Sequence, residues 1–299
     1  YNLRLNDQTP GETHVPHSLT RPPIIVTDAA CDLPADALET YAIHVAPLTL
    51  LFGDQAFRSG VDITPDEFYR RLAASDVHPT TSQPTMTEFA DLYRRLGAKD
   101  QPILSIHLSE RLSGTVNAAH QAARTVPDIP VTVYDSGTLT AALGLQALTA
   151  ARAARAGYSV EQILPLLEYT HETGGMFFTV DDLSYLHRGG RIGSVRYQIG
   201  QILHIKPIIT VAKTGPKAGA YVQVGRARSM AKAVDVFVSQ IAEHVGAGGK
   251  LRAISLYGDS PELAEQLNRR LAETFDCVYL EMMPTAPVLG VHVGPEALG

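Results

Sequence analysis

The chain has 299 residues and a mass of 32.2 kDa, and 45% of its residues are hydrophobic against 19% that are charged. This balance excludes a disordered or collagen-like protein. The formal net charge of −6 argues against general nucleic-acid binding, which requires a basic surface. The two cysteines, Cys31 and Cys277, are too few for a disulfide framework or a multi-cysteine metal site.

The sequence pattern also predicts neither a transmembrane span nor a secretory signal. No run approaches about 18 consecutive apolar residues, so we expect no transmembrane span. Residues 1–22 are polar and lack the apolar stretch of a secretory signal. We expect these residues to be a polar leader, either disordered or added to the natural chain, ahead of a cytoplasmic protein.

The first half of the chain alternates strands with helices. Residues 23–28 form a short apolar run typical of a buried parallel strand, and Thr64 and Thr85 each begin a capping pattern that precedes a helix. The predicted strands cover residues 23–28, 43–52, 103–108 and 131–134, and the predicted helices begin at Pro34 and cover residues 64–74, 85–96, 113–125 and 138–156. This alternation indicates a parallel sheet with crossover helices.

The second half mixes helices with a predicted hairpin. Strands at 207–213 and 221–226 flank Gly215-Pro216-Lys217, which favours a turn. The remaining predicted strands cover 176–180, 253–257 and 278–282, and the predicted helices cover 159–171, 181–187, 229–245 and 261–273. We therefore expect an α/β protein with two α/β domains. An N-terminal parallel sheet would occupy residues 23–171, and a C-terminal mixed sheet would occupy residues 172–299.

Common catalytic signatures are absent from the sequence. There is no G-x-S-x-G elbow, no P-loop, no H-E-x-x-H motif and no metal-ligand spacing among the eleven histidines. Ligands of open parallel sheets bind at the carboxyl ends of the strands. We expect three polar segments, residues 27–32, 79–84 and 109–115, to lie there. The pattern therefore favours binding over catalysis.

Three positions in or near such segments are candidates, and each has two interpretations. Thr81 lies in a hydroxyl-rich segment between two predicted helices. Ser113 is either the N-cap of the following helix or part of an anion site, where Gly114 would let a ligand approach the backbone. His292, in a β-like apolar run at 286–295, is either a core histidine or a donor to an acid.

Six segments carry a resemblance to a known family. They are residues 26–34 (VTDAACDLP), 81–84 (TSQP), 112–115 (LSGT), 186–193 (LHRGGRIG), 205–208 (IKPI) and 291–295 (VHVGP). With these segments in the family's order, the chain resembles the DegV family. These fatty-acid-binding proteins, also called FakB, are the carrier subunits of bacterial fatty acid kinase. Two departures are Ala29-Ala30, which replaces a hydroxyl pair, and Glu296, which replaces a glycine.

The resemblance implies an apolar tunnel between the two domains that holds one long-chain fatty acid, such as palmitate or oleate, with no metal or other cofactor. It implies that Thr81, Ser113, Gly114 and His292 bind the carboxylate. Arg191 and Arg226 correspond to exposed arginines that face the kinase. The implied partners are the fatty acid and the kinase catalytic subunit, which would form an acyl phosphate on the bound acid. Transient membrane contact would allow lipid exchange.

Two alternatives stay open at this point. Ser113 and His292 could act as an esterase-like pair, although the sequence shows neither a nucleophile elbow nor an identifiable orienting acid. A regulatory module that senses lipid would share the same pocket and would differ only in its partners. The preferred interpretation is a lipid carrier without catalysis of its own.

Overall fold

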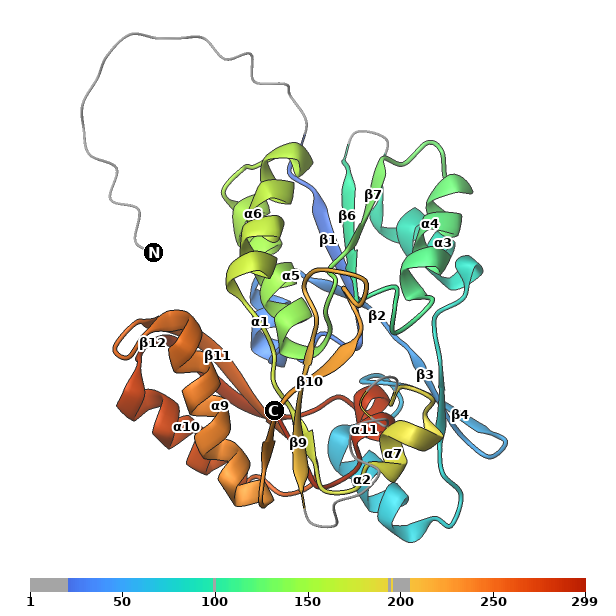
Figure 1. Ribbon diagram of the computed structural model, residues 1–299. Coiled ribbons are helices and arrows are strands. Elements are labelled where there is room, and N and C mark those ends of the chain that lie inside the picture. The colour runs from blue at the N-terminus through green and yellow to red at the C-terminus, as the bar shows by residue number, and fades with distance from the viewer. Residues whose placement is uncertain (1–20, 99–100, 193–194, 196–204) are drawn as a thin grey trace, which may run out of the picture.

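A four-stranded parallel sheet forms the centre of the N-terminal part (Figure 1). The computed structural model describes residues 21–98, 101–192, 195 and 205–299. The strands of this sheet are β1 (Ile24–Asp28), β2 (His44–Ala46), β6 (Ile103–His107) and β7 (Val131–Asp135), in the order β2-β1-β6-β7. Because all four strands run parallel, their carboxyl ends meet at one edge, as the sequence predicts.

Helices cover both faces of this sheet (Figure 1). The helices of the N-terminal part are α1 (Ala35–Thr40), α3 (Met86–Leu96), α4 (Thr115–Arg124), α5 (Thr140–Arg155) and α6 (Val160–Thr173). Val26 and Ile103 pack toward α3 and α4, whereas Ile25 and Leu104 pack toward α5 and α6. Successive strand residues point to opposite faces, so burial of both faces explains why apolar residues point to both faces of β1 and β6.

The predicted capping patterns begin two helices. Thr64 accepts a hydrogen bond from the Glu67 amide at the start of α2 (Pro65–Ala74), and Thr85 and Glu88 form a reciprocal capping box at the start of α3. Of the two interpretations of Ser113, the N-cap is wrong. Gly114 is the N-cap of α4, and Ser113 Oγ accepts a hydrogen bond from the Thr115 amide at 3.4 Å.

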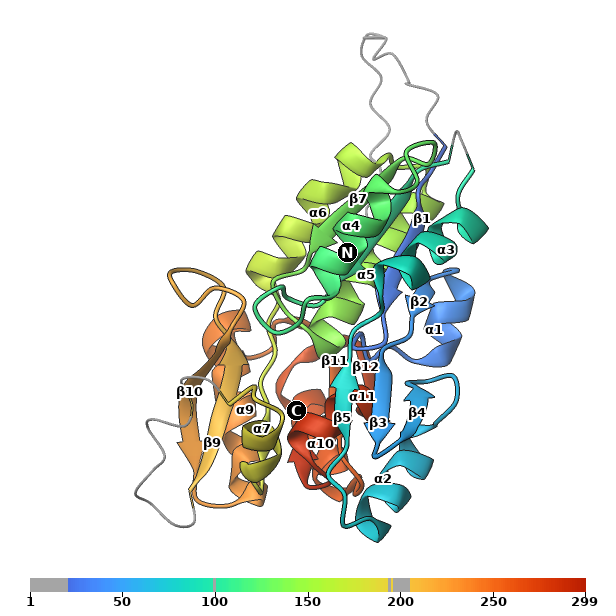
Figure 2. The ribbon, with the colours of Figure 1, turned by 90° about the vertical axis from the view of Figure 1, so that its right-hand side faces the viewer.

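A small antiparallel sheet lies beyond the parallel one (Figure 2). Its strands are β3 (Thr49–Phe52), β4 (Gln55–Arg58) and β5 (Thr80–Ser82), in the order β4-β3-β5. The polar segment 79–84, expected at the edge of the parallel sheet, therefore contains a strand of a different sheet. Thr81 pairs with Leu50 on β3. A β-branched residue such as threonine suits the pleated, half-buried surface of a strand.

The C-terminal part contains a mixed sheet, which confirms the predicted fold class. Its strands are β8 (Thr179–Val180), β11 (Lys250–Tyr257), β12 (Asp276–Pro284) and β13 (Ala297–Leu298), in the order β12-β11-β13-β8. Strands β11 and β12 are parallel, whereas β13 is antiparallel to both of its neighbours. The other elements are α7 (Ser184–Arg188), the hairpin of β9 (Lys206–Val211) and β10 (Tyr221–Ala227), α9 (Met230–Val245) and α10 (Glu262–Thr274).

Residues 286–295 contain a helix rather than the expected β-like run. Helix α11 (Pro287–Val293) has proline at its first position and buries Val288, Leu289 and Val291. A short apolar run that is buried on most sides has no periodicity that separates a strand from a helix. Val291 shares a buried cluster with Leu50 on β3, so α11 packs against the small antiparallel sheet.

A buried carboxylate joins the two parts of the molecule. Asp32, in the loop after β1, is 3% exposed and has a positive φ of 35°. Its Oδ2 accepts hydrogen bonds from Thr140 Oγ1 at 2.6 Å and Thr285 Oγ1 at 2.9 Å, and its Oδ1 accepts one from the Ala286 amide at 2.7 Å. Burial raises the pKa of Asp32 to about 6, although the three hydrogen bonds lower it. This Asp32 clamp ties the first residues of α5 and α11 to β1.

Replacing Thr285 with valine tests the Asp32 clamp, because this change keeps the side-chain shape and removes one donor. Hydrogen bonds to charged groups contribute about 1.5–3 kcal/mol, so we expect the free energy of unfolding to fall by about that amount at about pH 8. Protonation of Asp32 below its pKa of about 6 weakens the bond that is lost. The deficit should therefore shrink toward about pH 5, as denaturant titrations at both pH values would show.

Ser255→Ala is the matched control, because Ser255 is 1% exposed and its hydroxyl has no hydrogen-bond partner among the described residues. We expect the free energy of unfolding of this variant to be close to that of the parent. A Thr285→Val deficit that is the same at both pH values, or that Ser255→Ala reproduces, would contradict the role of the clamp.

Candidate functional site

A cavity of about 1130 Å³ lies between the N-terminal helices and the C-terminal elements. Its wall is built mainly by α5, α6, the β9–β10 hairpin, β11 and α11. Apolar residues that line it include Leu108, Leu139, Leu145, Leu166, Phe178, Val211, Tyr221, Ile254, Val288 and Leu289. Thr81, Ser113, Arg191 and His292 also line it. The structure thus brings four of the six predicted site residues to one cavity, although they come from distant parts of the chain.

Thr81 and His292 are in direct contact. Thr81 Oγ1 lies 3.0 Å from His292 Nε2, although 211 positions separate the two residues in the sequence. Thr81 is on β5 and His292 is on α11, and the packing of α11 against the small antiparallel sheet makes the contact possible. The segment that looked like a loop thus positions its hydroxyl through regular strand pairing.

His292 is neutral in this environment at neutral pH. Burial, together with the positive charge of Arg191 and the proximity of His78, lowers the pKa of its imidazole to about 4. Its Nδ1 is buried and has no hydrogen-bond partner among the described residues. The Gly189 backbone lies directly against Nδ1. A neutral imidazole beside a cation becomes easier to protonate when an anion binds nearby.

Ser113 and Gly114 lie just before α4. Ser113 Oγ is 2.8 Å from Thr115 Oγ1, and Ser113 is half-buried in the wall of the cavity. A side chain on Gly114 would overlap the amide group of Gln83, so glycine permits close packing of β5–α3 against the start of α4. Gly114 itself does not line the cavity.

The two arginines lie in different places. Arg191 is exposed and lines the cavity, and its guanidinium donates hydrogen bonds to the carbonyl oxygens of Gly189 at 2.7 Å and Leu112 at 3.4 Å. Arg226 is exposed on β10 and lines neither this cavity nor the smaller one described below. The structure therefore brings Arg191, but not Arg226, to the candidate site.

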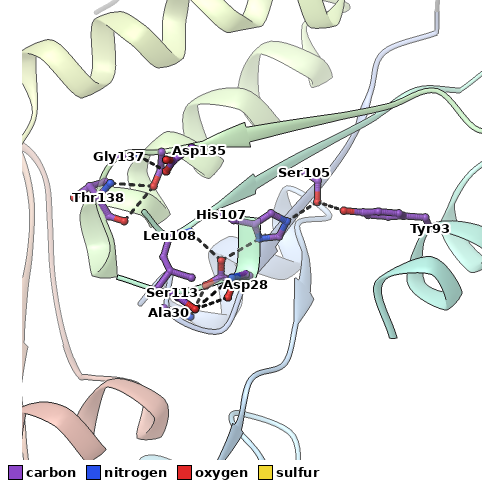
Figure 3. Close-up of polar contacts among 12 residues, drawn as sticks. Asp28, Ala30, Tyr93, Ser105, His107, Leu108, Ser113, Asp135, Gly137 and Thr138 are labelled. Carbon is purple, nitrogen blue, oxygen red and sulfur yellow. Dashed lines mark hydrogen bonds and ion pairs between the residues drawn. The ribbon is translucent and has the colours of Figure 1, made fainter. Parts of the chain in front are cut away.

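A buried chain of polar side chains was missed by the sequence analysis (Figure 3). Asp28 Oδ2 is 3.0 Å from His107 Nδ1, His107 Nε2 is 2.7 Å from Ser105 Oγ, and Tyr93 OH donates to Ser105 Oγ at 2.9 Å. The order Asp–His–Ser is that of a hydrolase triad, but Asp28, Ser105 and His107 are each 0% exposed. A substrate cannot reach this serine, so the chain is structural.

The buried chain fixes the loops that lead to the candidate site. The Asp28 carboxylate also accepts hydrogen bonds from the backbone amides of Ala30 and Leu108, both at 3.0 Å, and these two residues line the cavity. The sequence holds one signal for this chain, since Ser105 and His107 are two apart and so share one face of a strand. The contact with Asp28 follows only from the register of β1 with β6, in which Val26 pairs with Ser105.

Ser113 and His292 form hydrogen bonds with other residues and not with each other. Ser113 Oγ pairs with Thr115, and His292 Nε2 pairs with Thr81. The esterase-like alternative needs a hydrogen bond from the serine to the histidine and a third group that orients the histidine. The described hydrogen bonds of these two side chains include neither.

Among the described residues, the structure shows neither a metal site nor a membrane-spanning helix. No group of three or more His, Cys, Asp or Glu side chains among them could hold a metal ion. No helix within the described ranges has the length and hydrophobicity required to span a membrane.

Gly189→Ala tests how closely the backbone confines His292. Gly189 has a helical φ of −70°, so alanine costs nothing in backbone conformation, but its methyl group would overlap His292 Nδ1. We expect the imidazole to move out of its buried position, which would raise its pKa from about 4 toward the ordinary 6.5. An NMR titration of the histidine rings measures this change, and His292→Gln assigns the signal.

Gly175→Ala is the control, since an added methyl group there meets no atom within 4 Å. The His292 pKa should stay near about 4 in this variant. If Gly189→Ala also leaves it there, the contact does not confine the ring.

Comparisons with known proteins agree over almost the whole chain. The chain is 37% identical to a DegV domain-containing protein of Deinococcus radiodurans over 275 residues, which are 92% of this chain and 93% of the relative. It is 32% identical to Protein DegV of Bacillus subtilis over 276 residues, which are 92% and 96% of the two chains.

Solved structures show the same fold. A DegV family protein from Thermus thermophilus, described as fatty acid binding, superposes with a TM-score of 0.84 at 31% identity, over 92% of this chain and 96% of that one. DegV of Bacillus subtilis, described as a fatty acid binding protein, superposes with a TM-score of 0.83 at 31% identity, over 93% and 97%. The family model described as "Uncharacterised protein, DegV family" matches residues 24–299. The chain therefore belongs to the DegV family.

Proposed function

We propose that this protein binds a long-chain fatty acid in its large cavity and presents the carboxylate to a separate kinase. The observation that carries the proposal is the contact of Thr81 with His292 in the wall of an otherwise mainly apolar cavity. An apolar chain and a polar head group are the two parts of a fatty acid. The structural neighbours from Thermus thermophilus and Bacillus subtilis, described as fatty acid binding, support this assignment.

The size and lining of the cavity suit a long acyl chain. Its volume of about 1130 Å³ exceeds the about 300–1,000 Å³ of typical ligand pockets. A chain of about 14 methylenes gains about 11 kcal/mol in gross terms when it leaves water. Lost translational and rotational freedom offsets part of that gain.

The head-group site has a consistent hydrogen-bond arrangement. We assign the proton of the neutral His292 to Nε2, from which it would be donated to Thr81 Oγ1. The Thr81 hydroxyl can then donate to the carboxylate, and Ser113 can supply a second donor from the wall. Arg191 adds a nearby positive charge. A buried carboxylate requires several such donors.

The partner kinase would carry out the chemistry on the bound acid. One carboxylate oxygen would attack the terminal phosphorus of a nucleoside triphosphate held by the kinase. A new oxygen–phosphorus bond forms, the bond to the bridging oxygen breaks, and the nucleoside diphosphate leaves. The acyl phosphate stays with the carrier. Such a reaction places the protein in the cytoplasm, where the nucleotide is available.

Removing single donors tests the head-group assignment. We expect Ser113→Ala and Thr81→Val each to weaken fatty-acid binding by about 10- to 150-fold, which corresponds to about 1.5–3 kcal/mol for a donor to a charged group. Organic extraction of the purified parent, followed by mass spectrometry, should release a long-chain fatty acid. Calorimetry with palmitate and oleate on delipidated protein gives the affinities.

Thr80→Val is the matched control, because Thr80 precedes Thr81 on β5 but is exposed and lines neither cavity. It should bind like the parent. Parent protein that yields no fatty acid and takes up neither added acid would refute the proposed function. Unchanged affinity in both site variants would refute only the residue assignment.

Arg191 tests presentation to the kinase. We expect Arg191→Ala to retain most of its fatty-acid affinity, because the guanidinium is exposed, yet to lose most acyl-phosphate formation with the cognate kinase. Added salt should reproduce part of this loss in the parent. Arg94→Ala, an exposed arginine on α3 that lines neither cavity, is the control. Normal turnover by Arg191→Ala would exclude Arg191 from the partner surface.

A further inference from the structure

The large cavity has two polar ends. At the first end lie the proposed head-group residues and Arg191, and a smaller polar pocket of about 490 Å³ adjoins the cavity there. The second end is lined by Lys213, which follows β9, by Lys250 and Arg252 at the start of β11, and by the last residues of α6. None of the described residues that line the large cavity is Asp or Glu. Both ends therefore carry positive charge without a carboxylate of the protein in the lining.

Strand β11 separates the two ends. At its carboxyl end, Tyr257 pairs with Pro284 of β12, and α11 with His292 follows directly after β12. Lys250 begins the strand, so it lies about 23 Å from Tyr257 at about 3.3 Å per residue. The cations at the start of β11 are therefore remote from the head-group residues.

Lys213 lies at the same end of the cavity as Lys250. Strand β13 is antiparallel to both β11 and β8, so β8 runs parallel to β11. The bridge between Phe178, beside β8, and Ile209 of β9 is antiparallel, so β9 runs opposite to β11. The Lys213 ammonium donates a hydrogen bond to the carbonyl oxygen of Glu172 near the end of α6 at 2.8 Å. The end of α6 thus forms a third side of the second end.

One face of β11 changes from basic to apolar along the strand. Ile254 and Leu256 belong to the apolar cluster that includes residues of α5 and α6, whereas Leu251 packs against the cluster under α9 and α10. Alternate residues of a strand share a face. Lys250 and Arg252 therefore continue the face of the apolar cavity wall toward the second end.

The two cations on β11 are available to an anion. Lys250 and Arg252 are exposed, and their side chains form neither a hydrogen bond nor an ion pair with another described residue. Glu281 of β12 lies diagonally across from Arg252, but it forms no ion pair with Arg252 and does not line the cavity. The carboxylate of Glu172 interacts with Lys213, so Lys250 and Arg252 are the stronger candidates for binding an external anion.

A fatty acid with a methyl terminus matches only one of these ends. Tyr169 and Val278 line the cavity and are 61% and 49% exposed, so the second end opens to solvent. A methyl group there would lie beside water and cations, and it would gain little from burial. A second carboxylate at that terminus would instead accept charge-assisted hydrogen bonds from Lys250 and Arg252.

We infer that the cavity accepts long-chain α,ω-dicarboxylic acids and that their second carboxylate binds Lys250 and Arg252. The inference rests on the proposed function for the first carboxylate and names a further class of ligand for the same cavity. The methylene chain between the two carboxylates would lie along Ile254 and Leu256. The first carboxylate would stay at the head-group residues.

Hexadecanedioate and palmitate have equally long chains and differ only at the second terminus. We expect the double variant Lys250→Gln/Arg252→Gln to weaken hexadecanedioate binding by about fivefold or more, the size of effect that exposed ion pairs produce. Palmitate affinity should stay within about twofold of the parent. Calorimetry on delipidated protein measures both affinities. Added salt should weaken hexadecanedioate binding more in the parent than in the double variant.

Matched controls exist for the ligand and for the protein. Monomethyl hexadecanedioate keeps the chain but has an uncharged second terminus, so the double variant should bind it like the parent. Arg269→Gln removes an exposed arginine of α10 that lines neither cavity, and it should leave all affinities unchanged. Lys250→Arg/Arg252→Lys keeps both charges and should retain hexadecanedioate binding.

The outcomes separate this inference from the proposed function. If the double variant binds hexadecanedioate like the parent, or weakens the monomethyl ester equally, the second carboxylate site is refuted while palmitate binding still supports the proposed function. A parent that binds neither acid refutes the proposed function itself. Vesicles of phosphatidylglycerol test a competing role of the two cations, contact with an anionic lipid surface. Loss of vesicle cosedimentation in the double variant, with hexadecanedioate affinity unchanged, would assign the cations to that surface and overturn the inference.

Discussion

The hydrogen bonds of the Asp32 carboxylate fix the geometry on which the cavity depends. They join the loop after β1 to the first residues of α5 and α11, two helices that line the cavity. The pKa of Asp32 is raised in the folded chain, so the folded chain holds the carboxyl proton more tightly than the unfolded chain does. Between the ordinary pKa of 3.8 and about 6, the contribution of Asp32 to stability therefore falls as the pH rises. Ionised Asp32 therefore lowers the stability of the fold, and the role of its hydrogen bonds is to position α5 and α11.

The placement of α11 in turn determines the polar end of the cavity. His292 lies in the last turn of this helix, where it contacts Thr81 on β5 and packs against Gly189 after α7. Burial and the positive charge of Arg191 keep the His292 imidazole neutral at neutral pH. An arriving carboxylate balances the positive charge and makes the imidazole more basic.

The sequence predicted what depends on local pattern. The parallel sheet follows from short, mainly apolar runs between helices, and the starts of α2 and α3 follow from their capping residues. The helical state of α11 could not be predicted, since burial removed its periodicity. The strand at Thr81 depends on pairing with Leu50, and the Asp28–His107 contact depends on the register of β1 with β6. The candidate site residues were predicted from family motifs, whereas their contacts depend on tertiary packing.

The position of β13 has a consequence for synthesis of the protein. This strand is the last along the chain, yet it lies between β11 and β8 within the mixed sheet, and Gly299 exchanges backbone hydrogen bonds with Leu256 at 2.8 and 2.9 Å. During translation, β8 and β11 emerge long before the strand that joins them. The N-terminal parallel sheet can form early, but α11 and β13 reach the folding chain last. Until α11 joins the fold, His292 is missing from the wall of the cavity, so its contact with Thr81 on β5 forms only at a late stage of folding.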